Sequence, residues 1–250
     1  MKLYFFTLVL GLTLLHTTES LSQVTLQHYE QMRVDATIDP FLNPKMVNLL
    51  QKYREPMLAL VNRRIGYNPV VLTSRAPESL LSNFLADLLY KESVERSTSK
   101  IDAAVLNLGG IRASLPSGQI TVGDLYRVFP FENELVLVSM KGTVLSALLD
   151  QIAKSGGEGL SNIRFEIQNG KAQNATIGGQ AIHPDSLYTL ATMDYLSKGG
   201  SGMSAMLKAE GVVETHQKIR DAYIHQIDLL TAQGKNIESR LDGRIKHLAK

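Results

Sequence analysis

A turn signal in the second half of the chain constrains the fold more than any other single feature. The segment "IRFEIQNGKAQNATI" alternates apolar and polar residues on both sides of the pair Asn169-Gly170. An Asn-Gly pair readily adopts the left-handed backbone of a two-residue hairpin turn. The flanking segments are therefore expected to pair as antiparallel strands, and any fold for this chain must include such a pair.

The rest of the chain has both helical and extended patterns. Helices are expected where apolar residues recur every three or four positions, at 43–66, 77–93, 142–154 and 212–233. Thr121 and Asp124 form a capping box that predicts a short helix at 122–128. Strands are expected over apolar runs, at 69–75, 101–107, 134–140 and 186–196. The mixture predicts an α+β fold, or an α/β fold with an antiparallel part.

The amino-terminal segment has the pattern of a secretory signal. Lys2 precedes an apolar run of about thirteen residues, "LYFFTLVLGLTLL", and small residues follow in "HTTESLSQ". A bilayer-spanning helix needs roughly 20 apolar residues, so a membrane anchor is the less favoured interpretation. The pattern predicts a signal peptide at 1–22, cleaved after Ser20 or Ser22, and a leader segment at 23–42. The mature protein is then expected to be secreted or periplasmic.

Composition and missing motifs exclude several classes of function. The formal charge is +2 and the basic residues are scattered, so no nucleic-acid surface is expected. The chain has no cysteine, and its six histidines form no HxH, DxH or HExxH pattern, so no metal site or other cofactor is expected in this chain. No GxSxG, Walker or GxGxxG motif occurs. No membrane span is expected in the mature chain.

A glycine-rich turn follows the expected strand at 101–107. In "NLGGIR" the strand ends at Asn107, and Gly109 and Gly110 allow the backbone to approach a ligand closely. Exposed amides in such a turn, together with the guanidinium of Arg112, suit a phosphate or a carboxylate. The alternative is an ordinary tight turn with a surface arginine, and the motif alone leaves both interpretations open.

Aromatic residues stand near this turn and near a second glycine-rich loop. Phe129 and Phe131 flank a proline in "VFPFENELV", and one of the two is expected in the core. Tyr195 lies four residues before the glycine pair of "DYLSKGGSGM". Two such loops with two aromatic rings and an arginine would suffice to stack a planar base and hold an anionic group.

Taken together and in order, these segments resemble a known family. The segments "RAPESLLSNFLADLL", "LNLGGIRASLPSGQITVGDLYRVFPFENELVLVSMKGTVL" and "YTLATMDYLSKGGSGM" are similar to the C-terminal, substrate-binding domain of secreted 5′-nucleotidases. The resemblance covers roughly residues 40 to 245, and we assign the domain to 43–250. It implies an α+β sandwich of mixed sheet and helix, and it favours a ligand-binding role for the "NLGGIR" turn.

The resemblance also implies roles for individual residues. Phe131 and Tyr195 occupy the two positions that enclose the nucleobase, with tyrosine in place of the usual phenylalanine. Asn107 and Asn133 match polar positions beside the base. The glycine turn and its arginine belong to the same motif.

Two arginines are expected near the phosphate or its sugar. Arg112 matches an arginine of the family that holds these groups. Arg75, just before the helix expected at 77–93, matches a second one over a looser alignment.

One residue departs from the family pattern. Ser201 in "GGSG" stands where the family has an aspartate that binds the ribose hydroxyls. A serine offers one neutral hydroxyl, whereas a carboxylate accepts charge-assisted hydrogen bonds. Losing them would cost about 1–3 kcal/mol of sugar recognition. The expected ligand is therefore bound weakly, or is not a standard nucleoside 5′-monophosphate.

Full-length members of the family also carry an N-terminal metallophosphatase domain. Its DxH and GNH(D/E) motifs help to bind two divalent metal ions, and neither motif occurs in this sequence. We therefore expect a nucleotide-recognising or nucleoside-recognising subunit, inactive alone, whose partner is a separate metallophosphatase chain carrying both metal ions. The alternatives are a stand-alone secreted binding protein without catalysis, and a domain that has lost its ligand and only packs against a partner.

Overall fold

The computed structural model describes residues 43–248. The expected signal peptide and leader, at 1–22 and 23–42, lie outside the described residues. The chain divides between Asn48 and Leu49 into two units, and the fold below is that of the second unit. No helix described between residues 43 and 248 is both long enough and apolar enough to cross a bilayer.

A five-stranded sheet forms the centre of the domain, with the strand order β10-β4-β9-β2-β5. The pair β2–β9 is parallel, and the other three pairs are antiparallel. The strands are β2 (Ala103–Leu106), β4 (Glu134–Lys141), β5 (Gly159–Ser161), β9 (Leu187–Met193) and β10 (Gly211–Lys218). All four residues of β2 are buried, as expected for an interior strand.

Two smaller sheets complete the strand arrangement. The first has the order β11-β6-β7-β8, and the second pairs β1 with β3. The strands are β1 (Arg64–Asn68), β3 (Gly118–Thr121), β6 (Ile163–Gln168), β7 (Lys171–Ile177), β8 (Gln180–Ala181) and β11 (Ile245–His247). Asn169 and Gly170 have φ angles of 51° and 71° between β6 and β7, which confirms the hairpin predicted from the sequence.

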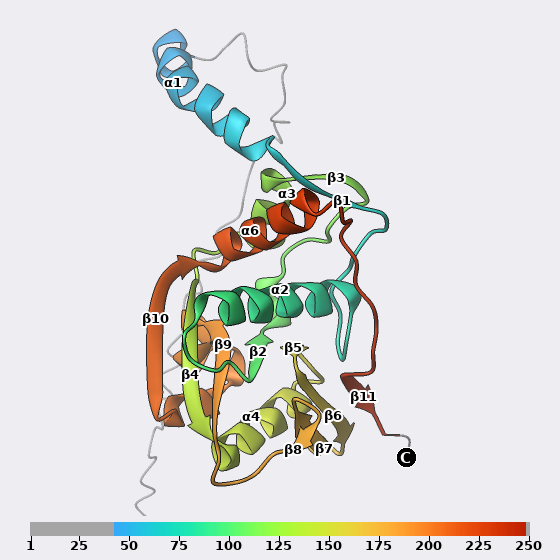
Figure 1. The fold of residues 1–250 in the computed structure, drawn as a ribbon. Coiled ribbons are helices and arrows are strands. Elements are labelled where there is room, and N and C mark those ends of the chain that lie inside the picture. The colour runs from blue at the N-terminus through green and yellow to red at the C-terminus, as the bar shows by residue number, and fades with distance from the viewer. Residues whose placement is uncertain (1–42, 249–250) are drawn as a thin grey trace, which may run out of the picture. The chain divides into compact units, whose positions relative to one another are not determined.

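Helices cover the central sheet and join it to the smaller sheets. Figure 1 shows α2 crossing the middle of the domain, with α6 on one side and β5 on the other, and α2 contacts both. The helices are α1 (Pro44–Val61), α2 (Leu80–Arg96), α3 (Val122–Val128), α4 (Gly142–Lys154), α5 (Asp194–Ser197) and α6 (Ile219–Ala232). Strands and helices together give the α+β fold that the sequence predicts.

Local signals correctly located several elements. Thr121 and Asp124 form the predicted capping box at the start of α3. Ser79 caps α2 in the same way, because its hydroxyl accepts from the backbone N–H of Ser82. The boundary between β4 and α4 falls where the apolar pattern changes period. The capping box at Thr121 depends on neighbours in the chain, which is why sequence reasoning could find it, whereas the cap at Ser79 was not predicted.

Four other predictions of secondary structure were wrong or only partly correct. The helix expected at 212–233 begins only at Ile219, because 211–218 forms the edge strand β10 on β4. The strand expected at 69–75 is reduced to a single bridge at Leu72, and β1 lies just before it. The first helix ends at Val61 rather than 66, and the strand expected at 186–196 ends at Met193. Sheet pairing decides most of these boundaries.

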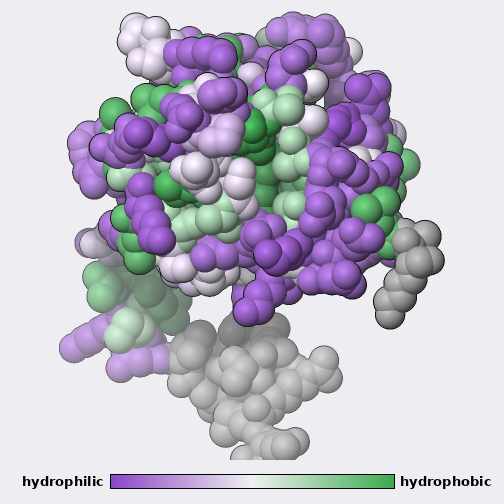
Figure 2. Space-filling view, turned by 90° about the horizontal axis from the view of Figure 1, so that it is seen from below, coloured by the Kyte–Doolittle hydropathy of each residue, from purple (hydrophilic) through white to green (hydrophobic). Residues whose placement is uncertain are grey.

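The face of the domain seen from below the view of Figure 1 is largely hydrophilic, with hydrophobic residues in smaller groups between (Figure 2). The buried core is continuous and includes Phe129, which meets Tyr223 edge-on at 5.7 Å between ring centres. Without any cysteine, this apolar core provides the main stabilisation.

Candidate functional site

The order of the central strands brings three chain segments to one edge of the sheet. The strands β2 and β9 are parallel neighbours, so the segments that follow Leu106 and Met193 leave at the same edge. The strand β4 is antiparallel to β9, with Leu135 opposite Met193, so the segment before Glu134 reaches this edge as well. Ligands commonly bind where strand ends converge in this way.

A cavity of about 350 Å³ lies at this edge. We name it the glycine-turn pocket, and it is lined by Asn107, Gly109, Gly110, Phe131, Asn133, Tyr195 and Ser201. All seven belong to the site predicted from the sequence. The volume lies in the range of small-molecule sites, about 300–1,000 Å³.

The two phenylalanines around Pro130 have different environments. Phe129 is completely buried in the core, whereas Phe131 is 45% exposed and lines the glycine-turn pocket. Tyr195, at 49% exposure, lines the same pocket. A large aromatic side chain that is half exposed in a cavity retains apolar surface for a ligand to cover. The two aromatic rings thus face one common cavity instead of separate interiors.

Glycine is required where the first loop turns beside the core. A Cβ on Gly110 would lie 3.0 Å from Oδ1 of Asn107 and 3.2 Å from Cε2 of Phe129. In the second loop, a Cβ on Gly200 would lie 2.5 Å from the ring of Tyr195. Both loops therefore pack against side chains of the site so closely that a larger residue would displace them.

Hydrogen bonds join the two glycine loops. The amide Nδ2 of Asn107 donates to Oγ of Ser201 at 2.8 Å, and the backbone N–H of Ser201 donates to Oη of Tyr195 at 3.2 Å. Ser201 has a φ of 54°, a left-handed conformation that costs energy for a serine. The hydroxyl that tyrosine adds here thus stabilises the loop, while the Ser201 hydroxyl keeps a proton to donate.

Polar atoms of two asparagines remain available in the pocket wall. Oδ1 of Asn107 is buried and has no hydrogen-bond partner among the residues that the structure describes. Asn133 donates from Nδ2 to the sulfur of Met193 at 3.3 Å, a weak acceptor. A ligand with N–H groups would satisfy acceptors that the protein itself leaves unpaired.

The two predicted arginines do not line this pocket. Arg112 is exposed, and its Nη1 donates to the carbonyl of Gly109 at 3.2 Å, so it is held against the glycine turn at the rim. Arg75 is exposed in the loop before α2, and its side chain makes no hydrogen bond or ion pair with residues 43–248. The structure thus keeps Arg112 next to the site and does not bring Arg75 into its lining.

Two supporting residues were missed by sequence reasoning. Oε2 of Glu158 accepts from the backbone N–H of Leu108 at 2.5 Å and so fixes the start of the glycine turn. Burial raises the pKa of this carboxyl, and the bond from Leu108 opposes that shift. Buried Arg220 donates to the carbonyls of Phe129 and Phe131 at 3.1 and 3.4 Å. The only sequence signal for either residue was the position of Glu158, an acidic residue inside the glycine-rich segment "GGEG".

The described residues offer no metal centre. Between residues 43 and 248, no three or more His, Cys, Asp or Glu side chains come together in a way that could hold an ion. The residues that line the glycine-turn pocket can supply stacking and hydrogen bonding, and Arg112 at its rim adds a positive charge.

Comparisons with known proteins find matches over much of the chain. The family model described as "5'-nucleotidase, C-terminal domain" matches residues 61–209. The trifunctional nucleotide phosphoesterase protein YfkN of Bacillus subtilis is 26% identical over 227 residues, covering 82% of this chain and 15% of that protein. Protein UshA of Yersinia enterocolitica is 30% identical over 166 residues, covering 64% of this chain and 30% of that protein.

A solved structure has the same fold. The 5′-nucleotidase precursor from Thermus thermophilus superposes with a TM-score of 0.68 at 26% identity, over 82% of this chain and 43% of that one. The chain spans less than half the length of each of these three proteins. Their similarity therefore concerns one part of a longer architecture.

Proposed function

The chain belongs to the family of 5′-nucleotidase C-terminal domains, and from that premise we propose that it recognises nucleotides or nucleosides for a hydrolase of nucleotide catabolism. One observation supports this above all others. Phe131 and Tyr195 line a single cavity together with two asparagines, a serine and two close-packed glycines. Half-exposed rings beside unpaired amide oxygens match a planar, nitrogen-rich ligand better than a purely apolar or a purely charged one.

Each group has a defined task in this proposal. The rings of Phe131 and Tyr195 stack on the base, while Asn107 and Asn133 accept from its N–H groups. The hydroxyl of Ser201 donates to the sugar. Arg112 at the rim neutralises part of the phosphate charge through charge-assisted hydrogen bonds. Together these contacts hold the substrate in a fixed orientation, which by itself contributes substantially to the rate of a displacement reaction.

The hydrolytic step is assigned to a separate metallophosphatase chain that carries two divalent metal ions. Such a metal pair generates hydroxide and stabilises the charge of the transition state. One finding supports placing the metal ions outside these residues: the 250 residues contain neither DxH nor GNH. If the expected signal peptide at 1–22 exports this chain to the periplasm or out of the cell, its partner must be exported as well.

The division of labour is tested by an activity assay. We expect the purified chain, supplied with Mn²⁺ or Zn²⁺, to release no phosphate from AMP. Adding a secreted metallophosphatase that lacks its own substrate domain should produce phosphate release. Turnover by rigorously purified chain alone would refute the assignment, and so would a failure of the mixed proteins to hydrolyse AMP although both are folded.

Recognition itself is tested by calorimetric titration with AMP and with adenosine. We expect saturable binding that Phe131→Ala abolishes. Tyr67→Ala is the matched control, because Tyr67 is also 49% exposed but does not line the glycine-turn pocket. Equal losses in the two variants would contradict a specific role for Phe131.

One observation favours a stand-alone binding protein as the second candidate. The Ser201 hydroxyl already accepts from Asn107, so it has one proton and one acceptor lone pair, and no charge, to offer a sugar. Weak sugar recognition suits capture of nucleosides or related compounds better than positioning for catalysis. Co-purification with a metallophosphatase would support the enzyme subunit, whereas tight adenosine binding without any such partner would support capture.

A further inference from the structure

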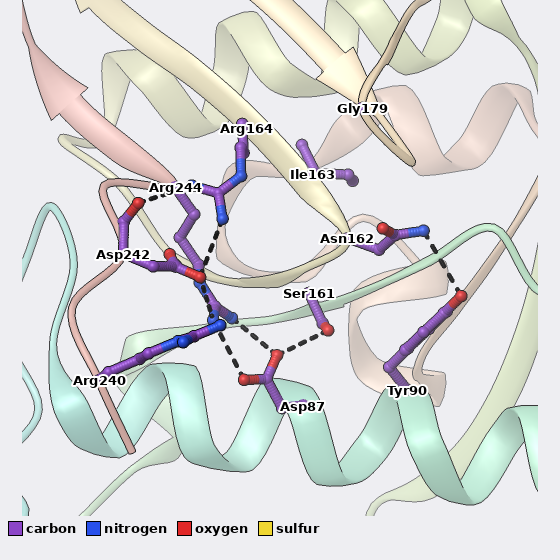
Figure 3. Close-up of a pocket in the computed structure, with 10 residues that line it drawn as sticks. All are labelled: Asp87, Tyr90, Ser161, Asn162, Ile163, Arg164, Gly179, Arg240, Asp242 and Arg244. Carbon is purple, nitrogen blue, oxygen red and sulfur yellow. Dashed lines mark hydrogen bonds and ion pairs between the residues drawn. The ribbon is translucent and has the colours of Figure 1, made fainter.

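A second cavity, of about 290 Å³, lies between α2, the junction of β5 with β6, and the segment before β11 (Figure 3). It shares no lining residue with the glycine-turn pocket. Its charged lining residues are Asp87, Arg164, Arg240, Asp242 and Arg244. We name this cavity the arginine pocket.

The guanidinium of Arg244 is fully occupied by hydrogen bonds within the protein. Arg244 is only 7% exposed, and its guanidinium donates to both oxygens of Asp87 at 2.8 and 3.1 Å. It also donates to both oxygens of Asp242 at 3.1 and 3.2 Å, and to the carbonyl of Leu160 at 2.6 Å. Buried charges must be paired in this way. Arg244 therefore ties the C-terminal segment to α2 and leaves little for a ligand.

The guanidinium of Arg164 is only partly occupied by hydrogen bonds within the protein. Arg164 donates from Nη1 to the backbone carbonyl of Asp242 at 2.6 Å and from Nη2 to its carboxylate at 3.0 Å. The other N–H groups of this half-exposed guanidinium have no acceptor among the described residues. Arg164 is thus fixed in position and can still donate hydrogen bonds.

The third arginine has a fixed backbone and a free head group. The carbonyl of Arg240 accepts from Nδ2 of Asn83 at 2.8 Å. Its neighbours are anchored as well, since Ser239 donates to the carbonyl of Leu80 at 2.7 Å and the N–H of Asp242 donates to Glu78 at 2.9 Å. The guanidinium of Arg240 makes no hydrogen bond or ion pair within residues 43–248. Figure 3 shows its side chain extending along the pocket toward Asp87 and Arg244.

The lining therefore has more positive than negative charge. Three guanidiniums and two carboxylates line the pocket. Both carboxylates are bonded to Arg244, and that of Asp242 also to Arg164, so neither is paired with Arg240. Uncompensated like charges at one site destabilise a fold. An anion that accepts from Arg240 and Arg164 would remove this repulsion. The cavity lies at the lower limit of about 300 Å³ for small-molecule pockets, which favours a compact anion over a whole nucleotide.

We infer that the arginine pocket binds a small oxyanion of the phosphate class, held by charge-assisted hydrogen bonds from Arg240 and Arg164. Planar guanidinium groups match the oxygen spacing of phosphate with paired N–H donors. The inference is independent of nucleotide recognition, because it involves none of the residues of the glycine-turn pocket.

Inorganic phosphate is the probe, titrated into the full chain by calorimetry and by thermal melting. We expect saturable binding and a melting temperature that rises with phosphate concentration. Arg240→Gln should weaken phosphate binding by about tenfold or more, because it removes a charged partner. The same variant should melt at an equal or higher temperature without phosphate, since one repulsive charge is gone. A purely structural role for Arg240 predicts the opposite change.

Arg64→Gln is the matched control. Arg64 is exposed in β1 and its side chain has no partner among the described residues, so this variant removes the same net charge elsewhere. Equal weakening by Arg64→Gln would overturn the inference, as would the absence of saturable phosphate binding.

A third experiment distinguishes binding of free phosphate in the arginine pocket from binding of the phosphate of a nucleotide. AMP binding should be unchanged in Arg240→Gln, and phosphate binding should be unchanged in Phe131→Ala. If Arg240→Gln abolished AMP binding, or Phe131→Ala abolished phosphate binding, the two cavities would not act as separate sites and the inference would fail. If Phe131→Ala loses only AMP binding, the inference about the arginine pocket stands.

Discussion

The glycine-turn pocket and the arginine pocket are built from opposite kinds of contact. The first is lined by aromatic rings and neutral amides, and its shape depends on two loops that leave neighbouring strands at one sheet edge. The second is lined by five charged side chains, and one ion pair among them, Asp87–Arg244, joins α2 to a segment more than 150 residues later in the chain.

The residues of the glycine-turn pocket therefore serve recognition, whereas the ion pairs of the arginine pocket serve stability. Neutral polar groups and half-exposed rings can be lost from the first pocket with little damage to the fold, because the core beneath them is apolar and complete. The ion pairs of the second pocket are part of the fold itself. Variants in the two pockets should therefore affect different measurements.

The largest effect is expected on stability, from Arg244→Met. It removes the five hydrogen bonds that the Arg244 guanidinium donates. Half-exposed Asp87 then has no cation, whereas Asp242 keeps Arg164, and losing these charge-assisted bonds costs about 3 kcal/mol. Urea denaturation should show this loss in the free energy of unfolding, while AMP affinity under native conditions stays unchanged. A parallel loss of AMP affinity in folded protein would show that the two pockets are coupled.

The next effect is expected on binding, from Tyr195→Ala. Removing an aromatic ring that stacks on a base costs about 1–3 kcal/mol, which weakens AMP by about tenfold to a hundredfold. Stability should change little, because the side chain is half exposed. Tyr195→Phe keeps the ring and loses only the bond from Ser201, so calorimetry should show a smaller loss. Equal losses in both variants would mean that the hydroxyl, and not stacking, is what matters.

A smaller effect, on both properties, is expected from Glu158→Leu. This change leaves the N–H of Leu108 without its acceptor, at a cost of about 1–2 kcal/mol, and loosens the glycine turn. AMP affinity and the urea midpoint should therefore fall together. Glu158→Gln keeps an acceptor oxygen without the buried charge and should restore both values. If Glu158→Leu binds AMP as well as the parent chain, the turn does not need this support.

The smallest effect is expected from Ser201→Asp. A carboxylate at this position would accept from Asn107 and from the sugar, raising AMP affinity by about 1 kcal/mol, or roughly fivefold. Calorimetry with AMP and with its 2′,3′-dideoxy analogue checks the reason, because only the ligand with hydroxyls should gain. An equal gain for both ligands would contradict a role at the sugar.

The strand ends beside the glycine-turn pocket could be predicted from local apolar runs, since Asn107 comes right after one such strand and Asn133 right before another. The roles expected of these two asparagines came from the family resemblance. The hairpin at Asn169 was predictable from a local signal, since its turn geometry depends on two adjacent residues.

The remaining features depend on contacts between distant residues. The segment 211–218 contains Val212, Val213 and Thr215, which favour strand, but pairing with β4 is what settles its structure. Glu158 is 50 residues from Leu108, and Asp87 is 157 residues from Arg244. No local pattern marks such partners, so a single sequence could predict neither the support of the turn nor the arginine pocket.

Binding of a base between the two glycine loops can be observed directly by NMR titration of the isotope-labelled chain with AMP. We expect saturable shifts, all with one dissociation constant, at the side-chain amides of Asn107 and Asn133, at the ring of Phe131 and at the backbone amides of Gly109 and Gly110. Saturable shifts confined to other parts of the domain, or no saturable shift at all, would contradict it.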